Sequence, residues 1–334
     1  MKYTKNIQKL LLNQHKKTKK NKSEIQANNN FQKMNCSPAV KNKQIRSDSC
    51  FTPEIFMTIL KKYNDKNPNN QILETNPKLA WLQLKSRLSC KKEECWLNQI
   101  DDEATKQQIK KYIFAPKHPP DWNDNPDEWL SNFDISDVAK QYEVSYPEFK
   151  SIGPTTIDFD TRLPESDGKC VLEDLCQFSL EKFISSKKTK IGIVFNLDKH
   201  DQSGSHWVSL YIDIKHKFMF FFDSADNGIP SEIWIDPDNV DSSKPLPLVN
   251  RIMSQGLKLS KPIRFTFYNN VGVTHQHGNT ECGMYSLFFI ITMLTGKTPF
   301  TKGILSMKKR RDLFLKSKIP DSVVFQYRKL YFND

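Results

Sequence analysis

A cysteine of this chain stands at the point where a loop gives way to a long apolar run. Residues 276–283 read Gln-His-Gly-Asn-Thr-Glu-Cys-Gly, and the apolar run 284–294 follows directly. We expect that run to form a buried helix with Cys282 at its N-terminal end. The positive end of the helix dipole and the free N–H groups of the first turn both favour a thiolate at such a position. The pattern therefore predicts that Cys282 is a nucleophile.

Two further residues, His206 and Asp223, are predicted to meet across a β-hairpin. Residues 207–214 alternate apolar and polar side chains, which indicates a half-buried strand, and the apolar run 218–222 indicates a strand buried on both faces. A tight turn near 214–215 sets position 206 directly opposite 223. Directly opposed residues have Cβ atoms about 4.5–5.5 Å apart on one face of a sheet. A register slip of one residue would move Asp223 to the other face.

These residue types supply a nucleophile, a base and an orienting carboxylate. An imidazole takes the thiol proton and later returns it to the leaving amine, so we expect His206 to be the general base of Cys282. A carboxylate fixes the tautomer of the ring and stabilises the imidazolium, which is the role predicted for Asp223. The tetrahedral intermediate needs preorganised donors for its oxyanion. The candidates are the backbone N–H of Cys282 and the side-chain amide of Gln276.

Each of these residues also has an ordinary structural explanation. A buried cysteine usually packs as a small apolar side chain. His206 would be solvated at the start of a strand, and the pair Asp223-Ser224 would open a turn. The combination favours catalysis, because a His placed opposite an Asp and a Gln placed six residues before a Cys-Gly helix start coincide in one chain.

These motifs resemble those of the ubiquitin-like-protein (SUMO) protease and adenain group, peptidase clan CE, in which His, Asp, Gln and Cys follow in this order. The matching segments are Gly-Ser-His-Trp at 204–207, Phe-Asp-Ser at 222–224 and the cysteine motif at 276–283. Trp-Leu-Ser-Asn at 129–132 is similar to the tryptophan-led segment that opens the catalytic domain of this family. The resemblance covers roughly residues 126–294.

The exact residues of the cysteine motif resemble one branch of this group more than the others. Glu281 stands where cellular SUMO proteases usually have Asp. The Asn-Thr-Glu-Cys-Gly form and the helical leader are closest in appearance to the polyprotein-processing proteases of large DNA viruses, of the African swine fever virus and mimivirus type.

The resemblance implies an α+β fold with a papain-like catalytic core, and the roles given above for His206, Asp223, Cys282 and Gln276. It also implies cleavage after Gly-Gly-type sites. In this family two tryptophans roof a narrow tunnel that admits only glycine, and Trp207 and Trp129 match them. A tunnel walled by flat rings excludes any Cβ. The alternative for both residues is a packing role in the core. No cofactor is expected.

Charge is concentrated at the start of the chain. The formal net charge is +12, and residues 1–48 carry most of it in a segment rich in Lys, Asn and Gln. Such a segment cannot bury enough apolar surface to fold, so residues 1–48 are predicted to be a disordered basic tail. A basic tail is a candidate for contact with nucleic acid. Against this, the tail lacks the aromatic residues that would stack on exposed bases.

The rest of the chain divides into two predicted domains. Residues 49–115 read as a helical accessory domain, because Thr52-Pro53 is a helix-start signal and apolar residues follow at helical spacing. The proline-rich stretch 115–120 is a stiff linker. Residues 121–334 are predicted to be the cysteine protease catalytic domain.

Seven cysteines without a regular framework, an odd count and the lack of a signal peptide favour an intracellular, reducing compartment. The resemblance points to the host cytoplasm (the viral factory) and the virion. Cys90 and Cys95 would be half of a zinc site, but no second pair has suitable spacing, so no metal is expected. The apolar run 284–294 is too short to span a membrane.

The leading hypothesis is a thiol endopeptidase that matures viral structural precursors at Gly-Gly-Xaa sites. A deconjugase of SUMO or another ubiquitin-like protein is the alternative nearest in chemistry, and it would need a broad surface for a folded modifier. A clan-related acetyltransferase would use the same residue order with acetyl-CoA. A DNA-associated structural protein would explain the basic tail but not the catalytic residues.

Overall fold

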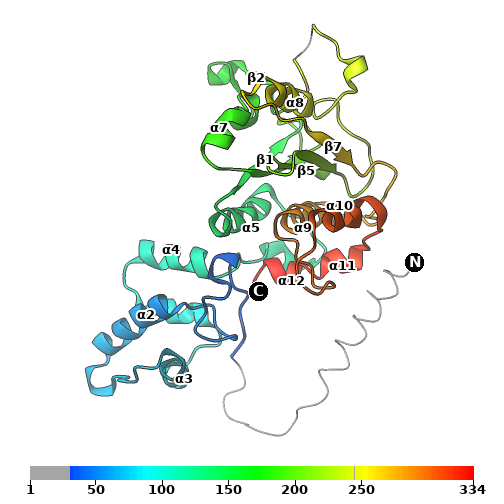
Figure 1. Ribbon diagram of the computed structural model, residues 1–334. Helices are drawn as coiled ribbons and strands as arrows, with labels where there is room; N and C mark the ends of the chain where they lie inside the picture. The colour runs from blue at the N-terminus through cyan, green and yellow to red at the C-terminus, as the bar shows by residue number, and fades with distance from the viewer. Residues whose placement is uncertain (1–30, 244) are drawn as a thin grey trace. The chain divides into compact units, whose positions relative to one another are not determined.

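The chain is represented by a computed structural model that describes residues 31–243 and 245–334 (Figure 1). The described residues form two compact units. The first comprises residues 31–118 together with Leu330–Asp334, and the second is Pro119–Lys329. The last five residues thus belong to the first unit and not to the catalytic domain predicted for 121–334. The first thirty residues of the predicted tail lie outside the described part.

The first unit is built on three helices, as the sequence predicts for 49–115. They are α2 (Pro53–Lys66), α3 (Pro77–Arg87) and α4 (Glu103–Ile113). Pro53 opens α2, and the side-chain oxygen of Thr52 accepts a hydrogen bond from the backbone N–H of Ile55 (3.4 Å). Trp81 and Trp96 are fully buried at the centre of the unit, with their rings 5.3 Å apart.

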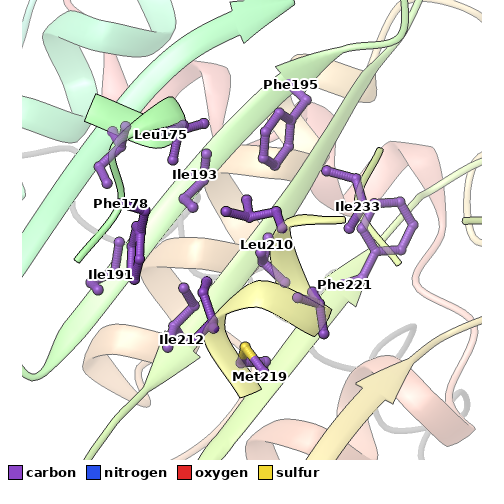
Figure 2. Close-up of a cluster of buried hydrophobic side chains, with 14 of the residues drawn as sticks. Leu175, Phe178, Ile191, Ile193, Phe195, Leu210, Ile212, Met219, Phe221 and Ile233 are labelled. Atoms are coloured by element: carbon purple, nitrogen blue, oxygen red, sulfur yellow. The ribbon is translucent and has the colours of Figure 1, made fainter. Parts of the chain in front are cut away.

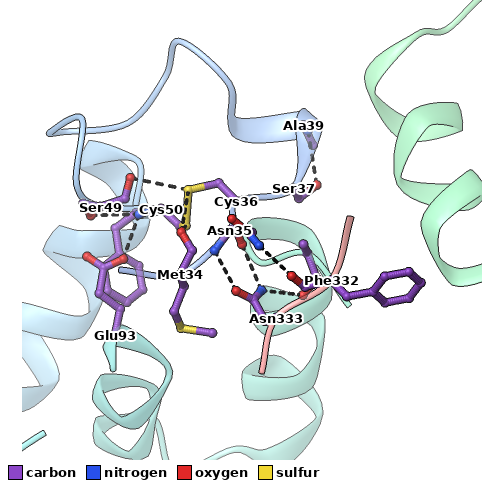
Figure 3. The surroundings of a disulfide bond; sticks show 12 residues. Met34, Asn35, Cys36, Ser37, Ala39, Ser49, Cys50, Glu93, Phe332 and Asn333 are labelled. Atoms are coloured by element: carbon purple, nitrogen blue, oxygen red, sulfur yellow. Dashed lines mark hydrogen bonds between the residues drawn. A yellow bond between two sulfur atoms is a disulfide. The ribbon is translucent and has the colours of Figure 1, made fainter. Parts of the chain in front are cut away.

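Residues 31–48 fold into this first unit, so the predicted tail is too long by that segment. Its apolar residues are few, but Met34, Val40 and Ile45 are all buried in the core of the unit. The Asn333 side chain accepts from the backbone N–H of Asn35 (2.6 Å) and donates to its carbonyl (3.0 Å), as Figure 3 shows. The prediction of a disordered tail rested on the average composition of residues 1–48, which is dominated by lysine and asparagine. An average does not reveal three separate apolar residues that pack into a core.

The second unit contains a five-stranded sheet, a two-stranded ribbon and most of the helices. The main sheet has the strands β1 (Phe149–Thr156), β4 (Lys190–Asn196), β5 (Trp207–Asp213), β6 (Phe218–Phe222) and β7 (Thr266–Asn269), in the order β1-β4-β5-β6-β7, and β2 (Arg162–Leu163) pairs with β3 (Lys169–Cys170). The helices are α5 (Asn132–Ser145), α6 (Glu173–Cys176), α7 (Leu180–Ser185), α8 (Leu248–Lys258), α9 (Cys282–Thr295), α10 (Met307–Lys316), α11 (Asp321–Phe325) and α12 (Arg328–Tyr331), the last of which continues into the first unit. The pairs β1–β4 and β6–β7 are parallel, and the two central pairs are antiparallel.

Helices cover both faces of the main sheet (Figure 1). Leu210, Ile212, Met219 and Phe221 point to the face that α6, α7 and α8 cover, and Figure 2 shows this cluster. On the opposite face α9 packs against β5, and the ring of Phe220 meets α9 and α10. This α+β arrangement confirms the predicted fold class.

Strand β5 is buried on both faces, which corrects the prediction of a half-buried strand. The alternation of apolar and polar residues placed Ser209, Tyr211 and Asp213 on the solvent-facing side of the strand, but all three side chains are fully buried. The reason is α9, which is buried along its whole length and covers the face that the alternation assigned to solvent. For β6 the prediction of burial on both faces is confirmed.

The β5–β6 hairpin has a longer turn than predicted. Asp213 pairs with Phe218, so the turn comprises residues 214–217 and not 214–215 alone. The Asp213 carboxylate accepts a hydrogen bond from the backbone N–H of His216 (2.9 Å), and Lys217 adopts a left-handed φ of 56°. Both features stabilise the four-residue turn. The register therefore differs from the predicted one by two residues.

His206 and Asp223 are consequently diagonal neighbours and are not directly opposed. A shift of two residues keeps side chains on the same face, whereas a shift of one would have separated them. Diagonal neighbours, about 7–8 Å apart, are still within reach of long side chains. The predicted meeting of these two residues thus survives an error in the predicted register.

Six of the seven cysteines form disulfide bonds, which differs from the free thiols expected from the sequence. The pairs are Cys36–Cys50, Cys90–Cys95 and Cys170–Cys176, and Cys282 is free. Figure 3 shows the first of these bonds. Cys90 and Cys95 bond to each other, so they are not half of a zinc site. Across the described part of the chain, no helix has both the length and the apolar character needed to cross a membrane.

Candidate active site

His206 and Asp223 lie at the adjoining ends of two neighbouring strands. His206 directly precedes β5 and Asp223 directly follows β6. The Nε2 atom of His206 lies 2.6 Å from Oδ1 of Asp223, which is a short hydrogen bond between two largely buried side chains. The carboxylate also accepts hydrogen bonds from the backbone N–H groups of Ala225 (2.9 Å) and Asn227 (2.7 Å). One backbone N–H thus bonds to each carboxylate oxygen, which restrains the carboxylate beside the imidazole.

The protonated form of His206 is favoured at this site. Burial by itself would lower the pKa of His206, but hydrogen bonds to Asp223 and to Cys282, with the attraction of both groups, raise it to about 9. Burial would likewise raise the pKa of Asp223, but the hydrogen bond and the charge of His206 lower it. Because Nε2 faces Asp223, the other ring nitrogen, Nδ1, remains for Cys282. The ring therefore links a carboxylate and a thiol.

Cys282 is the first residue of α9 and is almost fully buried. Gly283 follows it at a tightly packed position, where an added side chain would push its neighbours aside. A Cβ built on Gly283 would lie 3.1 Å from Cβ of Leu130 and 3.3 Å from Cδ1 of Trp207. The close packing brings the start of α9 against Trp207, which is the residue after His206. The N-terminal N–H groups of α9 and the imidazole thus meet at the thiol.

Gln276 lies in the loop between β7 and α9, with its side chain buried and its orientation fixed. Its Oε1 atom accepts a hydrogen bond from the hydroxyl of Ser224 (2.7 Å), and its Nε2 donates to the carbonyl of Gly278 (2.9 Å). Its backbone N–H donates to the carbonyl of Ser224 (2.8 Å). An amide nitrogen carries two hydrogens, so one N–H of Gln276 is left to donate to another acceptor.

The two predicted tunnel tryptophans lie on neighbouring segments. The indole N–H of Trp207 donates to the carbonyl of Leu130 (3.1 Å), the residue after Trp129. Trp207 is buried, whereas Trp129 is only half-buried. Most of the Trp207 side chain therefore packs inside the protein. Trp129 contributes most of the surface that this pair exposes to solvent.

Three residues that support the site were not predicted. Asn270 accepts from the backbone N–H of Asp223 (2.9 Å) and donates to its carbonyl (2.7 Å), so its amide pairs with Asp223 as a neighbouring strand would. Ser224 orients Gln276, and Arg328 forms a buried ion pair with Glu281 (2.8 Å). The Asp-Ser pair was visible in the sequence, but nothing near Asn270 or Arg328 indicated their distant partners.

His275 is a structural histidine beside the site. It is fully buried; its Nε2 lies 3.0 Å from the carbonyl of Phe314, and its Nδ1 accepts from the backbone N–H of Ile319 (3.2 Å). Burial lowers its pKa to about 4, so the ring is neutral at physiological pH. Within residues 31–243 and 245–334, no group of three or more His, Cys, Asp or Glu side chains is placed to hold a metal ion.

Comparisons with known proteins find proteases that are similar to this chain. Residues 180–318 match the model of the Ulp1 protease family, C-terminal catalytic domain. A thiol protease of Acanthamoeba polyphaga mimivirus is 26% identical over 283 residues, which are 79% of this chain and 85% of that protein. A cysteine protease of African swine fever virus (isolate Tick/Malawi/Lil 20-1/1983) is 25% identical over 223 residues, or 63% of this chain and 76% of that protein.

A solved structure extends the likeness to the fold of most of the chain. The crystal structure of an African swine fever virus protease superimposes with a TM-score of 0.56 at 20% identity, covering 90% of this chain and 96% of that one. The resemblance seen in the sequence motifs is thereby confirmed. This chain is a cysteine protease, and its residues 180–318 are similar to the catalytic domain of the Ulp1 protease family.

Proposed function

We propose that the protein is a thiol endopeptidase in which Cys282 is the nucleophile, His206 the general base and Asp223 the orienting carboxylate. The observation that carries this proposal is the 2.6 Å contact between His206 Nε2 and Asp223 Oδ1 on a ring that also interacts with Cys282. A cysteine at a helix start, an imidazole and a carboxylate are the groups that activate a thiol for attack on a peptide carbonyl.

The reaction runs in two halves. The Cys282 thiolate attacks the scissile carbonyl carbon, and the oxyanion that forms is stabilised by the backbone N–H of Cys282 and the free N–H of Gln276. The intermediate collapses, the C–N bond breaks, and His206 gives its proton to the leaving amine. Water then attacks the thioester with His206 as base, which releases the carboxylic acid and restores the thiol. Asp223 holds the ring in one orientation through both halves.

We further propose cleavage after Gly-Gly-type sites, with Trp207 and Trp129 forming the glycine-selective surface. This rests on the contact of Trp207 with Leu130, which sets the two tryptophan-bearing segments side by side next to Cys282. In the cell the substrates would be viral structural precursors. This is supported by similarity to the mimivirus and African swine fever virus proteases. The predicted host-cytoplasm and virion location, and contact of the basic tail with nucleic acid, stay predictions.

The test is mass spectrometry of a peptide library that contains Gly-Gly-Xaa and matched Ala-Ala-Xaa sequences. We expect cuts after glycine pairs with the wild type and none with Cys282→Ala or His206→Ala. The matched control is His200→Ala, because His200 forms a similar 2.6 Å contact with Asp158 away from Cys282. Its turnover should stay within about twofold of wild type, since surface changes are usually small. Full activity of Cys282→Ala would refute the mechanism.

Deconjugation of a ubiquitin-like protein is the second candidate, because a relative at 23% identity bears the name SUMO-1 cysteine protease. The two candidates differ in the substrate they need. A maturation protease should cut short Gly-Gly peptides, whereas a deconjugase should cut only when a folded modifier precedes the glycines. A conjugate of a folded modifier, added to the library, separates them: cleavage of the conjugate alone would favour deconjugation.

A further inference from the structure

The loop that carries Gln276 and leads into Cys282 has little backbone structure of its own. Between Gln276 and the first turn of α9, the backbone N–H groups of His277 and Gly278 bond to one side chain, the carboxylate of Asp321. The distances are 3.1 Å and 2.8 Å, both to Oδ2. Two N–H groups held by one charged oxygen are a strong anchor, since charge-assisted hydrogen bonds are about twice as strong as neutral ones.

The same carboxylate also reaches the nucleophile helix. Its Oδ1 atom lies 2.9 Å from the hydroxyl of Tyr285, which is buried one turn after Cys282. Asp321 therefore connects the loop that holds Gln276 with the helix that holds the thiol. The connection is short and rigid, because Tyr285 is fixed by the core around it and its hydroxyl lies 2.6 Å from the carbonyl of Ile319.

A chain of hydrogen bonds leads from Asp321 to the Gln276 amide. Asp321 fixes the N–H of Gly278, and the carbonyl of Gly278 accepts one hydrogen of Gln276 Nε2 (2.9 Å). The Ser224 hydroxyl fixes the other end of the amide through Oε1. Because both Oε1 and one hydrogen of Nε2 are held, the orientation of the second Nε2–H bond of Gln276 is fixed. Donors act on an oxyanion only when they are aimed before the charge develops.

We propose that Asp321 is a positioning residue of this protease, and that it aims the free N–H of Gln276 at the oxyanion through the backbone of His277 and Gly278. The match to the Ulp1 family model ends at residue 318, so Asp321 lies beyond the matched residues. The inference rests on the proposed role of Gln276 as an oxyanion donor.

The test compares Asp321→Ala with wild type in three assays on the full chain. Because the oxyanion exists only in the transition state, kcat for a cleaved peptide should fall about 10- to 100-fold while KM changes little. Affinity for a peptide aldehyde, which forms an oxyanion with the thiol, should fall with kcat. Alkylation of Cys282 by iodoacetamide forms no oxyanion, so its rate should stay within about twofold of wild type.

Two further variants separate positioning from general damage. Asp321→Asn keeps one oxygen for the N–H groups of His277 and Gly278, so it should restore most of kcat. Ser322→Ala is the matched control, because Ser322 is the exposed neighbour of Asp321. In a Gln276→Ala background, Asp321→Ala should cause no further loss of kcat, since residues that act as a unit are not additive.

Three outcomes would overturn the inference. They are an unchanged kcat in Asp321→Ala, additive losses in the double variant with Gln276→Ala, or an alkylation rate that falls in parallel with kcat. Each is distinct from failure of the proposed function. If the proposed function fails, Cys282→Ala retains turnover; if only this inference fails, Cys282→Ala is inactive and Asp321→Ala behaves in one of these ways.

Discussion

Arg328 forms a buried ion pair with Glu281, the residue directly before Cys282. The guanidinium donates to both carboxylate oxygens, with a closest distance of 2.8 Å, and both side chains are at most 5% exposed. It also donates to the carbonyls of Pro126 (3.0 Å) and Glu128 (2.7 Å). One arginine thus joins the start of α9 to the segment that leads to Trp129. A second element besides Asp321 therefore fixes the region around the thiol.

Breaking this pair should destabilise the second unit. Arg328→Met leaves Glu281 buried without its partner, which typically costs about 3–5 kcal/mol. The free energy of unfolding, from urea titration, should fall by that amount, whereas the exposed-site control Lys308→Gln should change it by less than about 0.5 kcal/mol. The double variant Glu281→Gln/Arg328→Met should recover part of the loss. Equal stability of Arg328→Met and wild type would contradict this account.

The sequence predicted the chemistry of the site better than the residues that support it. Cys282 and Gln276 stand in one local motif, and His206 and Asp223 flank one hairpin, so local patterns were enough to bring them to attention. Arg328, by contrast, meets its partner across 47 positions. Such a pair forms only when distant helices pack together, so the spacing of residues within one strand or helix cannot predict it.

The same limit explains the error in the fold prediction. Strand β5 read as half-buried because alternation shows only the chemical type of each side chain. Its second face is covered by α9, which begins 69 residues after β5 ends. The predicted hairpin register was wrong by two residues. The turn contains a hydrogen bond from the backbone N–H of His216 to the Asp213 carboxylate, and a pattern of apolar residues does not reveal such a bond. The strands and helices themselves could be predicted from the sequence, but the elements that pack against them could not.

The alkaline limb of the pH profile should report His206. Its pKa is raised to about 9, so the ring is protonated below that pH and loses its proton above it. Because the leaving amine needs that proton, kcat/KM should fall as pH rises through about 9. In Asp223→Asn the ring loses its carboxylate, its pKa drops, and the limb should move to lower pH by roughly one unit or more. An alkaline limb that is the same in both enzymes would exclude this assignment.

Asn270 should be required for the position of Asp223. Asn270→Ala leaves the buried backbone N–H and carbonyl of Asp223 without partners, which costs about 1–3 kcal/mol for an unsatisfied group. We expect lower stability in urea titration and lower kcat, because the carboxylate would no longer be held against His206. Asn269→Ala is the neighbouring control, since Asn269 is only half-buried. If Asn270→Ala kept both stability and kcat, the pairing would have no mechanical role.

Selection for glycine should depend on the ring of Trp207 and less on its N–H. A site that discriminates by one added methyl group gives roughly 10- to 200-fold preference. Ala-Ala carries two added methyl groups, so the wild type should prefer Gly-Gly over Ala-Ala peptides by at least about 10-fold. Trp207→Ala removes the flat wall and should reduce the preference to a few-fold. Trp207→Phe keeps a flat ring and loses the bond to Leu130, so it should retain most of the preference. The ratio of kcat/KM for the paired peptides measures this directly, and an unaltered ratio in Trp207→Ala would refute the tunnel.

Two truncations should separate the basic tail from the first unit. Deletion of residues 1–48 removes Met34, Val40 and Ile45 from the core and takes Cys36 from its disulfide. Each buried aliphatic side chain stabilises by about 1.5–3 kcal/mol, so this truncation should lower the thermal midpoint of unfolding strongly. Deletion of residues 1–30 removes none of these core residues and should leave the midpoint near that of the full chain. Equal midpoints for the two truncations would mean that 31–48 adds nothing to the core, despite its buried side chains.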